Sequence, residues 1–64
     1  MYQDWTKEDV AYWLENTVKL QQHVITFLDI EVDGKSLDLI DDKDLEDFGI
    51  NLKFHRKKIL DGIE

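Results

Sequence analysis

Acidic side chains at alternating positions in residues 29–34 have the spacing of a calcium-binding loop. Oxygen ligands fall at the first, third and fifth positions, and a glycine follows at the sixth: Asp29, Glu31, Asp33 and Gly34. The twelfth position of such a loop supplies a carboxylate that binds the ion through both oxygens, and here that position is Ile40. Because this ligand is absent, the sequence favours a solvated acidic turn over a metal site.

Residues that commonly serve as nucleophiles, bases and soft metal ligands are scarce. His23 and His55 are the only histidines, Ser36 is the only serine, and cysteine is absent. A zinc site would need several carboxylates to converge on the imidazoles, and a catalytic triad would need a histidine near the serine. His55 shares a predicted helical face with Ile59, so we expect it to pack rather than to act as a base. The sequence predicts a non-enzymatic chain with no metal or cofactor.

A short basic cluster with one aromatic side chain occupies residues 53–58. Three interpretations are open: contact with RNA phosphates, a solvated helix face, and a surface for an acidic protein partner. The net charge is −7 and unevenly spread. Residues 29–50 hold nine acids and two bases (−7), whereas residues 51–64 hold four bases and two acids (+2). An acidic body repels phosphate backbones and anionic lipid, so a protein partner is favoured and nucleic acid is disfavoured.

Two complementary protein-binding surfaces follow from this charge distribution. The basic one consists of Lys53, Phe54, Arg56 and Lys57. The acidic one consists of Asp38, Asp41, Asp42, Asp44 and Asp47. On a helical wheel, Phe54 lies about 160° from Leu52 at 100° per residue, so it should point away from the core. Aromatic residues and arginine are enriched at interface hot spots.

Helices must position these residues, because the chain has no proline and only three glycines. The run from Thr6 to Asp9 resembles a capping box, which predicts that the first helix begins at Thr6. Its inward face should consist of Val10, Trp13, Leu14 and Thr17. Trp5 and Trp13 are expected to belong to the core. A second helix is predicted from Leu20 to about Leu28.

The middle of the chain predicts a turn followed by a short helical segment. The turn falls at residues 33–34, and the segment after it carries Leu37 and Ile40. An aspartate cap within residues 41–44 then opens a fourth segment, of which Leu45 and Phe48 should face inward.

The last predicted helix follows a glycine. Gly49 should end the fourth segment in the left-handed conformation, and Asn51 should cap a final helix that runs to about Ile63. The core residues of this helix are expected to be Leu52, Ile59, Leu60 and Ile63.

Length and composition set the broad class. A chain of 64 residues is at most one small domain. No apolar run approaches the roughly 20 residues of a membrane span, and residues 1–9 are polar and acidic, unlike a secretory signal. We therefore expect no membrane insertion and an intracellular location, without a distinction between cytoplasm and nucleus.

An ordered set of residues spread over about 4–63 resembles the sterile alpha motif (SAM) domain family. The matching positions are Trp5, Val10, Trp13-Leu14, Phe27, Asp33-Gly34, Leu37, Leu39, Asp44-Leu45, Gly49-Ile50, His55-Arg56 and Ile59-Leu60. The resemblance implies one all-α domain over residues 1–64, folded as a compact five-helix bundle with a longer C-terminal helix.

SAM domains usually bind other SAM domains, either their own copies or those of a different protein, and some form polymers. The resemblance implies a head-to-tail contact between a mid-loop surface on the central helices and an end-helix surface at the start of the last helix. Phe54 departs from the family, which mostly has glycine at that position. The alternative is a monomeric adaptor that recruits a different protein through one surface, and RNA-hairpin binding is a third, disfavoured function.

Overall fold

Five α-helices and three shorter helical turns follow one another along residues 2–63, the part of the chain that the computed structural model describes. In chain order they are η1 (Tyr2–Asp4), α1 (Lys7–Trp13), η2 (Leu14–Val18), η3 (Gln21–His23), α2 (Val24–Ile30), α3 (Gly34–Leu39), α4 (Asp42–Asp47) and α5 (Lys53–Ile63). No strand occurs in this range. The prediction of an all-α bundle of five helices, with the last one the longest, is confirmed.

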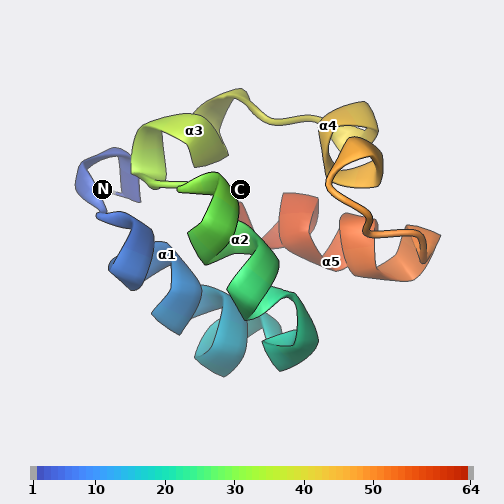
Figure 1. Cartoon of the computed structure of the whole chain (residues 1–64), viewed down its shortest axis with the longest axis horizontal. Helices are drawn as coiled ribbons and strands as arrows, with labels where there is room; N and C mark the ends of the chain where they lie inside the picture. The colour runs from blue at the N-terminus through green and yellow to red at the C-terminus, as the bar shows by residue number, and fades with distance from the viewer. Residues whose placement is uncertain (1, 64) are drawn as a thin grey trace.

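Helices α1 and α2 pack side by side, with α3 above their upper ends and α4 beside the start of α5 (Figure 1). Each α-helix contributes at least one buried apolar side chain to a common core: Val10, Trp13, Phe27, Leu37, Leu45 and Ile59. Trp5 and Phe48 are partly buried against this core. The molecule measures 27 × 20 × 20 Å, so most of its residues lie close to the surface.

Two helix starts form as their sequences predict. Thr6 precedes α1, and its hydroxyl oxygen accepts a hydrogen bond from the Asp9 amide while the Asp9 carboxylate accepts one from the Thr6 amide. Asp41 and Asp44 make the same reciprocal pair at the start of α4. Such a box satisfies two amides that a helix start otherwise leaves unpaired.

The first helix ends in a π-helical turn that changes which residues face the core. Along η2, Val18 is buried and Thr17 is exposed, so the prediction that Thr17 faces inward is wrong. A π turn closes its hydrogen bonds over five residues instead of four. The extra residue shifts the inward position by one, from Thr17 to Val18. Lys19 then ends the turn in the left-handed conformation, with φ of 67°.

The second helix begins later than predicted, and the third begins earlier. Residues 21–23 form a separate turn, so α2 starts at Val24 and ends at Ile30, where Glu31 adopts φ of 62°. Gly34 is the first residue of α3 instead of part of a turn, and Asp33 caps the helix through a hydrogen bond from the Ser36 amide.

Gly34 is required because the chain passes very close to it. Its amide donates to the Trp5 carbonyl at 2.9 Å, and a Cβ on Gly34 would lie only 1.8 Å from the Tyr2 carbonyl oxygen. Only glycine permits this approach, so the N-terminal segment lies directly against the start of α3.

The link from α4 to α5 turns at Gly49, which has φ of 93° as predicted. The Gly49 amide donates to the Glu46 carbonyl and the Ile50 amide to the Leu45 carbonyl, the two bonds of a Schellman ending. Gly49 is thus in the left-handed position after α4, and Ile50 is fully buried beyond it.

The start of α5 differs from its prediction in two residues. The Leu52 carbonyl accepts the amides of His55 and Arg56, so Leu52 occupies the cap position that was expected for Asn51. The Leu52 side chain is 60 % exposed instead of buried. Ile50 occupies the core just before it, which leaves Leu52 on the solvent side, while Ile59 is buried as expected and Leu60 and Ile63 are partly buried.

Candidate protein-interaction surfaces

The start of α5 presents apolar and basic side chains to solvent. Phe54 is 77 % exposed, as its position on the helical wheel predicted, and Leu52 lies beside it in the sequence with its side chain also outside. Lys53 and Lys57 are exposed, and neither makes a side-chain hydrogen bond or ion pair within residues 2–63. We call these four residues (Leu52, Lys53, Phe54 and Lys57) the α5-start surface.

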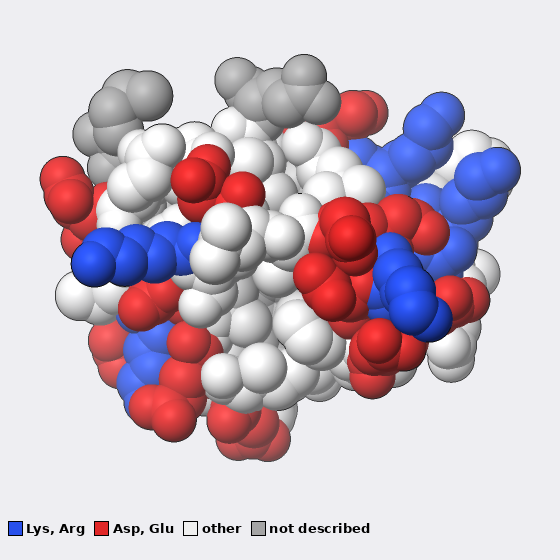
Figure 2. Space-filling model, turned by 90° about the horizontal axis from the view of Figure 1, so that it is seen from above, with Lys and Arg blue, Asp and Glu red and all other residues white. Residues whose placement is uncertain are grey.

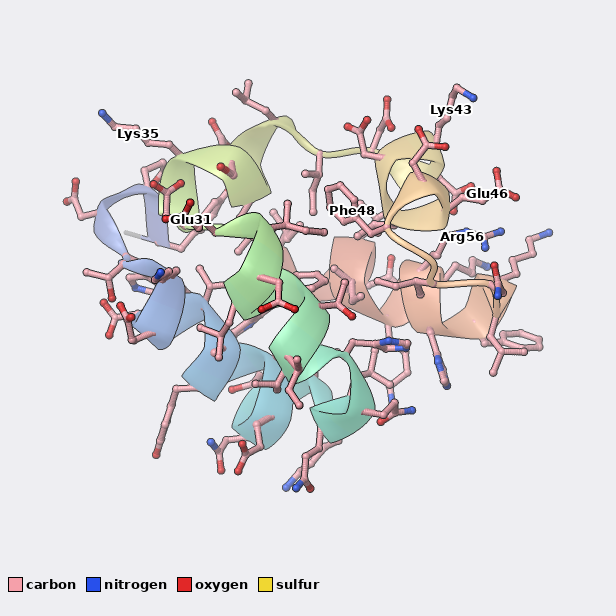
Figure 3. All side chains as sticks on the ribbon, viewed as in Figure 1. Glu31, Lys35, Lys43, Glu46, Phe48 and Arg56 are labelled. Carbon is pink, nitrogen blue, oxygen red and sulfur yellow. The ribbon has the colours of Figure 1, made fainter. Side chains whose placement is uncertain are left out.

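Arg56 does not belong to this surface, although the sequence placed it there. It is 9 % exposed, and its Nε donates to Asp42 Oδ1 at 2.8 Å. One of its terminal nitrogens donates to the carbonyls of Ile50 (2.8 Å) and Asn51 (3.1 Å). Figure 3 shows Arg56 at the junction of α4 and α5. The guanidinium satisfies carbonyl groups that the turn between the helices leaves unpaired, so Arg56 has a structural role.

Most of the predicted acidic residues also have partners within the chain. Asp41 and Asp44 cap α4 and Asp42 binds Arg56. Asp38 accepts a hydrogen bond from the Tyr2 hydroxyl at 2.7 Å, and this bond raises the pKa of Tyr2 above its usual value because it is lost when the hydroxyl ionises. The predicted acidic set is therefore partly structural, and its members differ in how available they are to a partner.

Asp47 is the predicted aspartate that remains exposed without a side-chain hydrogen bond or ion pair among the described residues. Two further exposed side chains that the sequence interpretation missed lie on the helices that carry the predicted aspartates: Glu46 in α4 and Leu39 in α3, the latter 80 % exposed. The signal for Leu39 was present, because two helical residues after the buried Leu37 a side chain lies on the opposite face. We call Asp38, Leu39, Glu46 and Asp47 the acidic surface.

Acidic and basic side chains occur close together rather than at opposite poles of the molecule. Figure 2 shows acidic side chains gathered over the part that contains α4, with basic side chains at the adjoining edge. The Arg56–Asp42 ion pair joins these two regions. Lys43 also projects from α4 near Glu46 (Figure 3), which reduces the negative charge of this helix.

The two histidines form a contact between distant parts of the chain. His23 Nε2 and His55 Nδ1 are 3.1 Å apart, and the rings meet edge to face with centroids 5.2 Å apart. Burial, and secondarily the charge of His55, lower the pKa of His23. His55 therefore packs at the edge of the core, as expected.

The acidic segment 29–34 does not converge on a central point. Asp33 is used to cap α3, and hydrogen bonding from Ser36 lowers its pKa. Glu31 lies 3.6 Å from the Lys7 ammonium group. No group of three or more His, Asp or Glu side chains placed to hold a metal ion occurs in residues 2–63. Within the same range, no helix is both long and apolar enough to span a bilayer.

Comparison with known proteins identifies relatives of this chain. Residues 3–64 match the family described as SAM domain (Sterile alpha motif). The chain is 46 % identical over 55 residues to SH3 and multiple ankyrin repeat domains protein 2 of Rattus norvegicus, an alignment that covers 86 % of this chain and 4 % of the relative. The human protein of the same name is 44 % identical over 55 residues, with 86 % and 3 % covered.

A relative with a different name aligns over more of the chain. Diacylglycerol kinase eta of Drosophila ananassae is 36 % identical over 61 residues, which is 95 % of this chain and 3 % of that protein. The chain thus spans only a few per cent of the length of each of these relatives.

Proposed function

The chain belongs to the SAM-domain family, and from that premise we propose that it associates head to tail with another SAM domain, its own copy or that of a different protein. SAM domains in general are protein–protein interaction modules without enzymatic activity, and they bind other SAM domains. The proposed contact joins the α5-start surface of one molecule to the acidic surface of the next.

The main support for this proposal is Phe54. Its ring is largely exposed at the start of α5, and Leu52 adds a second exposed apolar side chain. Neither residue contributes to the core, so the fold does not explain them. Lys53 and Lys57 are exposed in the same first turns of α5 and add positive charge to this apolar pair. A desolvated aromatic anchor within a charged rim is typical of interface hot spots.

The acidic surface supplies a matching arrangement. Leu39 is an exposed apolar side chain, and Asp38, Glu46 and Asp47 provide negative charge. Opposite charges steer the encounter and fix the register of the two partners. Two different patches on one molecule make a heterologous contact, which repeats into a filament when its rotation does not close.

Charge-reversal variants test the proposal. Lys57→Glu removes positive charge from one surface and Asp47→Lys removes negative charge from the other, and neither side chain supports the fold. We expect each variant to be monomeric by light scattering at concentrations where the wild type associates. An equal mixture should form a discrete heterodimer, because each variant keeps one intact surface.

Asp29→Lys provides a matched control for Asp47→Lys, since it changes the net charge by the same amount at an exposed position in α2. This variant should associate like the wild type. Raising salt from about 0.05 to 0.5 M should weaken the wild-type contact by screening. Failure of the two charge-reversal variants to pair with each other would contradict the two-surface proposal.

A one-sided adaptor is the alternative function. Its α5-start surface would bind a different protein, while the acidic surface would remain unused. A wild-type chain that stays monomeric at about millimolar concentration, where contacts of about 4 kcal/mol are detected, would favour this alternative. The exposed Phe54 supports both functions, and concentration-dependent light scattering distinguishes them.

A further inference from the structure

A cleft of about 380 Å³ follows the outer side of α1 and η2, and its lining is mainly aromatic. The lining residues are Trp5, Asp9, Tyr12, Trp13 and Thr17. Pockets for small ligands span about 300–1,000 Å³, so this cleft has room for one side chain or a comparably small group. In Figure 1, α1 lies on the opposite side of the bundle from α4 and the start of α5.

The aromatic walls are held in place by the fold. The rings of Trp5 and Trp13 lie with centroids 6.2 Å apart and planes tilted by 55°. Gly62 near the end of α5 approaches Trp13 so closely that an added Cβ would lie 2.9 Å from the indole. Tyr12, by contrast, is 71 % exposed and adds nothing to the core. The Trp5 and Trp13 rings therefore form two fixed walls of the cleft, and the exposed Tyr12 ring forms a third wall that a ligand can contact.

The carboxylate of Asp9 is fixed at the edge of this cleft. Its Oδ2 accepts the Thr6 amide at 3.1 Å, while its Oδ1 accepts no hydrogen bond from residues 2–63. The surrounding charge is negative, because residues 2–18 hold four acids (Asp4, Glu8, Asp9 and Glu15) and one base (Lys7). That base lies against Glu31. A ligand here meets an oriented acceptor and aromatic faces, a combination that attracts cations.

We propose that this cleft binds an arginine side chain from a basic peptide segment of a partner protein. A guanidinium is planar, so it stacks on aromatic rings while its N–H groups donate to a carboxylate. An ammonium lacks the planar stacking face, and a quaternary ammonium has no N–H to donate to Asp9. Anionic ligands would be repelled by the same carboxylate.

This site goes beyond the SAM–SAM contact, because it uses neither the α5-start surface nor the acidic surface. A chain that is associated through the α5-start surface and the acidic surface of α3 and α4 uses none of the five lining residues, so the cleft would stay open to a peptide. The proposal therefore stands or falls independently of the association test, and it gives the exposed Tyr12 a role that the core does not.

A nuclear magnetic resonance titration tests the site with small probes. We expect N-acetyl-arginine amide to shift the indole N–H resonances of Trp5 and Trp13 in a saturable manner. N-acetyl-citrulline amide has nearly the same shape without the charge, and it should bind at least about tenfold more weakly, which corresponds to about 1.4 kcal/mol. Equal binding of both probes, or tighter binding of choline than of the arginine probe, would overturn the proposal.

Two variants locate the binding to the cleft. Tyr12→Ala removes an exposed wall, and Asp9→Asn removes the charge but keeps an oxygen that can accept the Thr6 amide. Each should weaken the arginine probe several-fold without loss of helicity by circular dichroism. Ile25→Ala, which truncates an equally exposed apolar side chain on α2, should bind like the wild type. Unchanged affinity in Tyr12→Ala would place the binding elsewhere and overturn the proposal.

Discussion

Helix α4 begins with two aspartates that cap it, whereas helix α5 begins with an exposed leucine and a lysine. The charges at the start of α4 satisfy backbone amides and suit the positive end of the helix dipole. Lys53 at the start of α5 has the wrong sign for that end, and Leu52 cannot cap it. Local rules that are broken without an evident gain to the fold point to function, and here they coincide with the α5-start surface.

Among changes to this pair of helices, substitution of Arg56 should have the largest effect on stability. Arg56→Met should lower the free energy of unfolding by about 3 kcal/mol, because it leaves the Ile50 and Asn51 carbonyls without a donor and Asp42 without a partner. Chemical denaturation measures the effect. Asp42→Asn keeps an acceptor on a more exposed residue and should cost less than about 1 kcal/mol. Equal, small costs would return Arg56 to the surface role that the sequence suggested.

The turn between the two helices should show the next largest effect. Gly49→Val forces a β-branched residue into φ of 93° and should cost about 1–3 kcal/mol in unfolding free energy. Gly49→Asn is the matched variant, because asparagine tolerates the left-handed region and should cost clearly less. Apart from its two sequence neighbours, no described residue has an atom within 4 Å of a Cβ at this position. A similar cost for both variants would mean that backbone conformation is not the cause.

Leu52→Ser should affect the two roles of this position in opposite directions: it should raise the stability of the domain and weaken its association. A serine at the cap position accepts an amide of the first turn, and it should raise the free energy of unfolding by about 0.5–1 kcal/mol. The same change removes apolar area from the α5-start surface, so light scattering should show weaker association. Higher stability with unchanged association would remove Leu52 from the interface.

The pH dependence of stability should show the smallest effect, through His23. The pKa of His23 is lowered below its usual 6.5 in the folded chain, so the unfolded chain binds that proton more readily. The contribution of His23 to the free energy of unfolding is therefore fully present above about pH 6.5, and it decreases as the pH falls below that value. Urea midpoints at about pH 7.5 and 5.5 measure the decrease, and His23→Gln should reduce it. An unchanged slope would assign the dependence to other groups.

Features that depend on neighbouring residues were predictable, and features that depend on distant ones were not. Thr6 with Asp9 and the left-handed Gly49 are local signals that the structure confirms. The burial of Arg56 depends on acceptors that come together only when α4 and α5 pack. The π turn that puts Val18 in the core in place of Thr17 has no signature in apolar spacing, because that spacing assumes the α-helical period of 3.6 residues throughout.

The same difference between local and distant signals applies to the candidate surfaces. Phe54 was placed outside by helical geometry alone, and it is outside. The aspartates were grouped by charge, but charge alone does not reveal which carboxylates cap a helix or bind an arginine. Trp5 and Trp13 were expected in the core, and both contact it. Their exposed edges form a cleft only because Tyr12 and Asp9 share the same side of α1.

The left-handed endings at Lys19 and Glu31 bear on how this sequence can change over time. Two segments end on side-chain-bearing residues with φ of 67° and 62°, where glycine is usually found. Each such residue gives up about 1 kcal/mol of stability relative to a relaxed backbone. A glycine at Lys19 would relieve that strain without changing either surface or the cleft, whereas a glycine at Glu31 would also remove the ion pair with Lys7. The chain therefore lies below the stability available to its fold, and a single codon change at these endings would let it tolerate an otherwise harmful mutation elsewhere.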